Sequence, residues 1–191
     1  MCANATAQQF DKFFADSTLR LDYIFAGDTS RQAIYVDGQC LIPRWDGRRQ
    51  RMDELPVAGN GQITVKDKGS GQEIYRHAFS TLFQEWLATA EAKHTSKSFE
   101  NVFLVPYPRQ AVDITVELRD YHNRITASLT HTVDPADILI RRIGFEHVTP
   151  YQTIQKAADT TRCIHIAYVA EGYRSDEMEA FLNDAKDATE A

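Results

Sequence analysis

The sequence predicts a mainly β fold, an antiparallel β-sandwich over roughly residues 17–150 followed by a truncated α/β segment. Seven or eight short apolar runs, separated by turn residues, indicate the sandwich. After residue 162 the pattern changes to one apolar run, a glycine and an amphipathic stretch, which is typical of strand, turn and helix. With 43% hydrophobic and 25% charged residues, the 191-residue chain has a globular composition.

The first predicted strand covers residues 19–25, where alternate side chains are large and apolar. This two-residue period is typical of a strand with one buried face. Residues 33–36 form the second predicted strand, which we expect Asp37-Gly38 to close, because both residues favour turns.

Two hairpins are predicted in the middle of the chain. Residues 63–65 and 73–79 flank a glycine-rich turn at 68–71. Residues 112–118 alternate strictly, and residues 125–133 return after a short polar turn, which makes this the clearest hairpin in the sequence.

Two more strands complete the predicted sandwich. Residues 99–105 form one, and we expect Pro106 and Pro108 to stop it, because proline donates no backbone hydrogen bond. Residues 138–145 form the other.

One helical stretch interrupts the strands. Residues 81–92 predict a short helix or an irregular crossover, with Thr81 and Gln84 in the spacing of a capping box. Its apolar residues share one helical face. They are Leu82, Phe83, Trp86, Leu87 and Ala90.

The C-terminal part predicts a strand at residues 163–169 and a helix from Ser175 to about residue 188. Met178, Phe181 and Leu182 lie on one face of that helix. One strand and one helix cannot bury their apolar faces alone. We therefore expect them either to dock on the sandwich or to belong to a second domain that has been cut, with these three side chains exposed or packed against another copy.

Three regions follow from these patterns. Residues 1–16 are expected to be disordered or loosely ordered, residues 17–150 form the sandwich, and residues 151–191 hold a linker and the strand–helix piece. The polar stretch 155–162 is the expected boundary. The small residues 3–7 are similar to the end of a signal-peptide cleavage site, and a disordered start explains them equally well.

Charge and composition exclude several classes of protein. The net charge is −6, which argues against a broad surface for nucleic acid or anionic membrane. No apolar run reaches the length of a membrane span. Of the three cysteines, we expect two to be buried small side chains and one to be a terminal thiol, while a Cys40–Cys163 disulfide stays possible.

The sequence holds no common catalytic signature. It lacks the H-E-x-x-H zinc motif, the G-x-S-x-G nucleophile turn, the Walker loop and G-x-G-x-x-G. His122 and His131 are interpreted as exposed, with a metal site between strands as the alternative, and His165 is expected to be packed. We therefore assign no catalytic, cofactor-binding or metal residue.

Two residues outside the C-terminal helix are candidates for a surface or interface. Trp45 lies in a polar stretch, so we interpret it as exposed, although it could also cover the edge of the sheet. Arg48 lies in a short basic run at 47–51, interpreted as a solvated loop with an anion site as the alternative. The aromatic residues from Tyr75 to Tyr107 are expected to pack the core.

Several strings, taken in order, carry a family resemblance. They are Trp45-Asp46-Gly47-Arg48, the run from Ile74 to Trp86, Lys97 to Asn101, Val105 to Pro108, Val133-Asp134-Pro135, and Ala170 to Tyr173. With them, the chain from Phe10 to Ala191 resembles the N-terminal domain of the IgA-peptidase family of zinc metallopeptidases. The resemblance implies a β-sandwich that precedes a peptidase domain in an exported protein.

The same resemblance implies where the chemistry of the parent protein lies. Residues 164–181 look like the first strand and helix of the peptidase domain, so residues 151–191 would hold its truncated start. The zinc ligands of the family lie beyond this segment, and no residue here matches them. Zinc is therefore expected in the catalytic domain of the parent protein, and the 191-residue chain is expected to be inactive alone.

We expect a non-catalytic accessory domain of a secreted, periplasmic or cell-surface metallopeptidase. It would brace the downstream peptidase domain or help to hold a protein or glycoprotein substrate. The alternative is a stand-alone sandwich module that binds carbohydrate or another surface, with Trp45 in an exposed aromatic platform. No nucleic-acid partner and no membrane span are expected.

Overall fold

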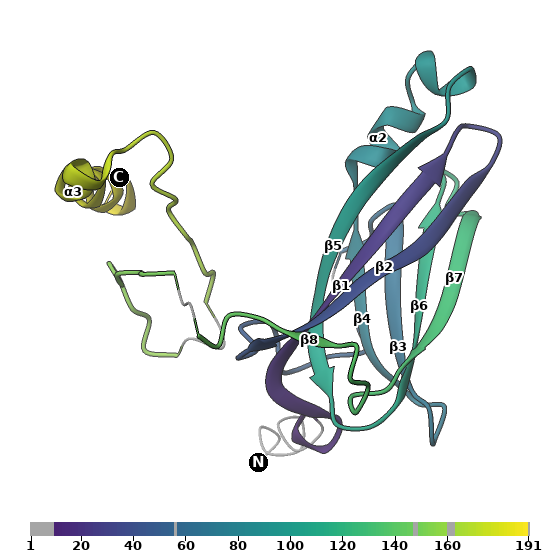
Figure 1. Cartoon of the computed structure of the whole chain (residues 1–191), viewed down its shortest axis with the longest axis horizontal. Helices are drawn as coiled ribbons and strands as arrows, with labels where there is room; N and C mark the ends of the chain where they lie inside the picture. The colour runs from purple at the N-terminus through teal and green to yellow at the C-terminus, as the bar shows by residue number, and fades with distance from the viewer. Residues whose placement is uncertain (1–9, 56, 147–148, 160–162, 191) are drawn as a thin grey trace. The chain divides into compact units, whose positions relative to one another are not determined.

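The computed structural model describes residues 10–55, 57–146, 149–159 and 163–190 (Figure 1). The chain divides into two compact units, residues 1–147 and 148–191. Among the described residues, no helix has the length and apolar character needed to cross a membrane.

The first unit is a sandwich of two four-stranded sheets, which confirms the predicted fold class (Figure 1). The first sheet has the strand order β5-β1-β2-β8 and the second β4-β3-β6-β7. All strand pairs are antiparallel except β2 with β8. The strands are β1 (Phe14–Gly27), β2 (Gln32–Pro43), β3 (Gly61–Asp67), β4 (Glu73–Phe79), β5 (Lys97–Pro108), β6 (Val112–Arg119), β7 (Ile125–Val133) and β8 (Arg141–Arg142).

The core lies between the two sheets and is filled by alternate residues of the strands. In β6, buried and half-buried residues alternate over the whole strand, as its sequence predicts. The predicted aromatic contribution is confirmed, because Tyr75, Phe79 and Phe103 are all buried in this core. The largest fully buried side chains are Tyr23, Phe10, Phe14, Phe25, Phe83, Leu19, Leu21, Ile63, Ile114, Leu118, Val65 and Val105.

Both predicted hairpins are confirmed. In the turn from β3 to β4, the Asp67 carboxylate accepts hydrogen bonds from the backbone N–H and the hydroxyl of Ser70, at 2.8 and 2.6 Å. In the turn after β6, the Asp120 carboxylate accepts hydrogen bonds from the backbone N–H groups of His122 and Arg124. Such side-chain bonds stabilise a turn locally, which explains why the sequence reveals these two turns.

Strand β2 does not end at Asp37-Gly38, so that prediction is wrong. The register pairs Asp22 with Gly38 and Tyr23 with Val36, so Asp37 is an extra residue in the strand. This is a β-bulge, for which glycine and aspartate are as suitable as they are for a turn.

Strand β5 also continues through its prolines, to Pro108. The prediction that Pro106 ends the strand is wrong, because β5 is the outer strand of its sheet and, within the described part of the chain, pairs with β1 alone. A proline is compatible with an outer strand when its nitrogen faces away from the partner strand. The strand predicted at residues 138–145 shrinks to Arg141–Arg142, and Ile138 and Leu139 are exposed.

The predicted helical stretch consists of two short helices, α2 (Leu82–Leu87) and the 3-10 helix η1 (Glu91–Lys93). Phe83 and Trp86 are buried, whereas Leu82 is 70% exposed. The predicted capping box is absent from this helix, since the Thr81 hydroxyl bonds the Gln84 side chain and no side chain caps the backbone.

The start of the chain is more ordered than predicted. Residues 1–9 lie outside the described residues, but residues 10–13 are helical and β1 begins at Phe14. Phe10 and Phe14 are 2% and 1% exposed. Burial of two aromatic side chains fixes this segment on the sandwich.

The second unit contains a 3-10 helix, η2 (Ser175–Glu177), and the helix α3 (Met178–Glu190). The predicted helix is therefore confirmed. The predicted strand at 163–169 is not formed, and Ile164 and Ile166 are 88% and 73% exposed. A strand needs a partner for its backbone N–H and C=O groups, and within the described residues none pairs with this segment.

The side chains that the sequence placed on one face of α3 are half-buried within their own unit. These are Met178, Phe181 and Leu182, and only Ala185 is fully buried. The ring of Phe181 lies 5.2 Å from that of Tyr173, and the Tyr173 hydroxyl donates to the Asp184 carboxylate. His165 and Cys163 are exposed, so the expectations of a packed histidine and a buried cysteine are wrong at these positions, whereas Cys40 is buried.

One polar contact joins the two sheets through the core. The Tyr23 hydroxyl of β1 lies 2.6 Å from Nε2 of His131 in β7. Burial raises the pKa of Tyr23, so its hydroxyl stays protonated, and the tautomer of His131 sets which of the two groups donates. Burial also lowers the pKa of His131, more than the backbone at Thr132 and the Asp113 carboxylate raise it. The interpretation of His131 as exposed is therefore wrong.

We expect the free energy of unfolding to fall as the pH falls from 8 to 5.5. The folded pKa of His131 is lowered from its ordinary value of 6.5, so its contribution is complete above that value and is lost as the pH falls toward the folded pKa. The slope is at most about 1.4 kcal/mol per pH unit for this one group. Urea unfolding at several pH values measures it.

The variant His131→Gln isolates this effect, because the pKa of His77 is also lowered and acts in the same direction. The difference between wild type and His131→Gln should shrink toward low pH. His122→Gln, at an exposed turn, is the matched control. A difference that stays constant with pH would contradict the assignment.

Candidate functional site

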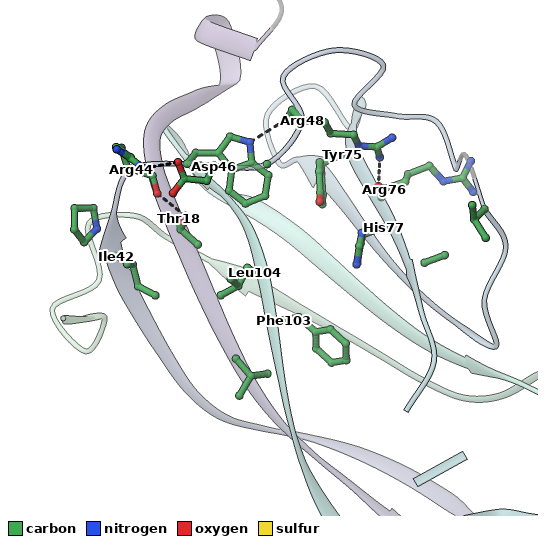
Figure 2. A pocket seen from close by; sticks show the side chains of 16 residues that line it. Thr18, Ile42, Arg44, Asp46, Arg48, Tyr75, Arg76, His77, Phe103 and Leu104 are labelled. Carbon is green, nitrogen blue, oxygen red and sulfur yellow. Dashed lines mark hydrogen bonds and ion pairs between the residues drawn. The ribbon is translucent and has the colours of Figure 1, made fainter. Parts of the chain in front are cut away.

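A groove of about 780 Å³ lies beside the outer strand β5 (Figure 2). Its walls come from β5, from the outer strand β4 of the other sheet, and from the loop that joins β2 to β3. Its volume is in the range of ligand sites. The lining residues are Thr18, Ile42, Pro43, Arg44, Trp45, Asp46, Gly47, Arg48, Val57, Tyr75, Arg76, His77, Ala78, Val102, Phe103 and Leu104.

Trp45 anchors the loop that forms one end of the groove. Its indole N–H donates to the Arg48 carbonyl at 2.9 Å, and its ring meets Tyr75 edge-on at 6.1 Å. The backbone bends closely around the ring, since a Cβ on Gly47 would lie 2.3 Å from it. The bend therefore requires a glycine at position 47, two residues after the tryptophan.

Arg48 joins this loop to the edge of β4. Its guanidinium donates to the carbonyls of Met52 and Arg76 and lies 5.4 Å from the centre of the Tyr75 ring. The Met52 carbonyl also accepts the Arg76 backbone N–H, at 2.8 Å. The loop thus covers part of the open edge of β4 and satisfies its backbone groups.

Arg49 links the same loop to the start of the chain. Its guanidinium donates to the Trp45 carbonyl and to the Asp16 carboxylate, and it lies 4.7 Å from the Phe10 ring. Hydrogen bonds from Trp45 and Arg49 lower the pKa of Asp16. Arg48 and Arg49 of the basic run are thus half-buried and hold the loop in place through their hydrogen bonds. The interpretation of the run as a solvated loop is wrong for these two residues.

The groove has a positive local charge. Its lining holds Arg44, Arg48 and Arg76 against the single carboxylate of Asp46, which pairs with Arg44 at 2.8 Å. Burial, and then the charge of Arg48, lower the pKa of His77. Because the protein is acidic as a whole, this local excess of arginine distinguishes the groove from the average surface.

The two sides of the groove differ in chemistry (Figure 2). Ile42 and Leu104, from the first sheet, form an apolar side, and Leu104 is 50% exposed. Tyr75 and His77, from β4, form an aromatic side with their rings nearly parallel, 6.4 Å apart. Phe103, from β5, also lines the groove and is 8% exposed.

The two candidate surface residues of the sandwich, Trp45 and Arg48, both line this groove, but only Arg48 is partly exposed. Trp45 is 6% exposed, so the prediction of an exposed aromatic platform at this residue is wrong, and it covers the sheet edge instead. Arg48 does line the groove, beside Trp45. Sequence reasoning missed Tyr75 and His77, although their alternation in a strand next to an arginine-rich loop was a signal for a shared face.

The described residues contain no group of three or more His, Cys, Asp or Glu side chains placed to hold a metal ion. A zinc site therefore does not fit the residues in the described ranges. What the groove offers is binding chemistry: an apolar side, aromatic rings and arginine charge.

Comparison with protein families matches residues 9–130 to the family described as Peptidase M64 N-terminus. The match covers more than half of the chain and runs from the start of the sandwich into β7. No curated protein matches the chain.

Proposed function

The chain belongs to the Peptidase M64 N-terminus family, and from this we propose that it is a non-catalytic accessory domain of a secreted zinc metallopeptidase. Its task is to brace the catalytic domain. The observation that carries the proposal is the coincidence of the family match with the sandwich, since the matched region is described as the N-terminus of a peptidase.

The architecture of the sandwich supports a bracing role. Its sheets are joined through the core by aromatic packing and by the contact between Tyr23 and His131. A close-packed sandwich of this kind is stiff and transmits strain instead of absorbing it. The sequence after Tyr151 has no run of glycine and serine, which would make a loose tether.

A second form of the accessory role is to hold a protein or glycoprotein substrate near the catalytic site. Such holding raises the effective concentration of the substrate without new chemistry. In both forms, zinc and the catalytic residues belong to the peptidase domain, and the protein acts outside the cytoplasm or at the cell surface.

The test compares the chain alone with the chain joined to a peptidase domain of the same family. We expect the 191-residue chain to bind no stoichiometric zinc and to cleave neither casein nor a glycoprotein. Joined to the peptidase domain, the chain should raise the thermal midpoint of that domain. A bracing role also predicts that the joined protein has the same kcat per zinc as the peptidase domain alone and loses its activity more slowly on heating.

The controls separate the two forms of the role. A substrate-holding role predicts a lower KM for protein substrates with no change for a short peptide. Stoichiometric zinc or proteolysis by the 191-residue chain would contradict the non-catalytic proposal. A joined protein with unchanged thermal midpoint and unchanged KM would contradict both forms.

A further inference from the structure

The free side of β5 presents unpaired backbone groups to the groove. Among the residues that the structure describes, β5 pairs with β1 on one side and with no strand on the other. Pro106 stands within β5, opposite Thr18. Because proline has no N–H to donate to β1, the nitrogen of Pro106 faces the free side of β5. Along a strand, the backbone N–H and C=O groups of successive residues point alternately to the two sides. The N–H and C=O groups of Val102 and Leu104 therefore face the free side as well.

The hairpin from β1 to β2 gives the same orientation independently. Asp28 N–H donates to the Arg31 carbonyl, so these two residues form a hydrogen-bonded pair. Counting back along β1, the backbone groups of Phe25 point away from β2 and toward β5, where Phe25 pairs with Phe99. The backbone N–H and C=O groups of the odd-numbered residues of β5 thus bond to β1, and those of the even-numbered residues face the free side.

The groove surrounds this free edge on both faces of the strand. Residues 102–104 line it together, although Val102 and Leu104 project from the outer face of the sheet and Phe103 from the inner face. An extended peptide paired with Leu104 would direct successive side chains to opposite sides. One set would meet Val102 and Leu104 on the outer face of β5, and the other Tyr75 and His77.

Charge decides which peptide fits. Among the described residues, Arg48 has no carboxylate partner in an ion pair, whereas Arg44 is paired with Asp46 and Arg76 with Glu73, so Arg48 is the lining arginine that can attract an acidic ligand. The aromatic side of the groove therefore favours acidic side chains, while the opposite side favours apolar ones.

We propose that the free edge of β5 at Val102–Leu104 binds an extended peptide in which acidic and apolar residues alternate, by β-strand addition. Backbone hydrogen bonds to Val102 and Leu104 supply the affinity, and the two sides of the groove supply the selectivity. This site is independent of the bracing role, since it rests on the geometry of the sandwich alone.

The test uses the 191-residue chain and the peptide (Glu-Val)₃-amide with fluorescein on its N-terminus, and follows binding by fluorescence anisotropy. We expect saturable binding. A peptide with lysine for glutamate should bind at least tenfold more weakly, and a peptide with N-methyl groups on alternate residues should lose binding, because N-methylation removes the donors that pair with β5.

The variant Leu104→Pro removes one N–H on the free side and keeps the hydrogen bonds to β1. We expect it to weaken binding by about two- to tenfold, as the loss of one hydrogen bond predicts. Ser98→Pro has the same backbone orientation but lies outside the groove, so it is the matched control and should bind as wild type does. Thermal melting checks that both variants fold.

Four results would overturn the proposal. The first is a lack of saturable binding to wild type. The second is equal affinity for the acidic, lysine and N-methylated peptides, which needs no variant to fold. The third is equal loss of affinity in Leu104→Pro and Ser98→Pro. The fourth is a wild-type dimer in sedimentation that excludes the peptide and that Leu104→Pro abolishes, which would assign the edge to a second copy of the chain.

Discussion

Replacing Phe25 by alanine is expected to lower the free energy of unfolding by about 3–5 kcal/mol, the range for a large aromatic side chain removed from a core. Phe25 is 0% exposed. Its ring centre lies 5.9 Å from that of Phe79, 6.3 Å from that of Phe83 and 6.0 Å from that of Phe103. These rings come from β4, α2 and β5, so one substitution weakens both sheets and the helix together.

Urea unfolding at pH 8 measures this loss, and Leu82→Ala is its control. Leu82 is 70% exposed, so its truncation should change the free energy of unfolding by about 0.5 kcal/mol or less. A similar loss in both variants would show that the aromatic cluster is not the centre of the core.

Replacing Trp45 by alanine is expected to cost about 3–5 kcal/mol as well, because the side chain is 6% exposed and anchors a connection between the sheets. The cavity would deprive Tyr75 of its edge-on neighbour and the Arg48 carbonyl of its donor. The loop would then leave the edge of β4, and trypsin should cut faster after Arg48 and Arg51.

Two milder variants separate packing from hydrogen bonding at this site. Trp45→Phe keeps an aromatic ring and loses the N–H, so about 1–3 kcal/mol is expected. Asp46→Ala, next to it, removes an exposed side chain whose ion pair with Arg44 lies in solvent, and should be close to neutral. Unchanged trypsin cleavage in Trp45→Ala would contradict the anchoring role.

The strands and turns could be predicted where the signal lies in residues that are close together in the sequence. Alternation in β6 and the turn chemistry of Asp67 and Asp120 depend on residues close together in sequence. The predicted ends of β2 and β5 were wrong, because the residue types found there occur both in turns and within strands. Asp37 marks a bulge instead of a turn, and Pro106 lies within a strand, because both outcomes depend on the neighbouring strand.

The candidate site was less predictable than the fold. Trp45 stands among charged residues, which indicated exposure, yet Tyr75 of β4 and the Arg48 carbonyl enclose it. The groove needs β5, β4 and the loop after β2 to meet, and no local pattern encodes that meeting. The predicted strand at 163–169 failed for the same reason, since a strand exists only with a partner.

The sequence by itself determined the fold class, the buried faces of β1 and β6, and the family, since side-chain periodicity and ordered strings are local properties of the chain. The tertiary structure alone decided which strands are neighbours, that Trp45 is buried, and where an open edge meets arginine charge. The physical reason is that these features come from contacts between distant residues, as between Tyr23 and His131, 108 positions apart.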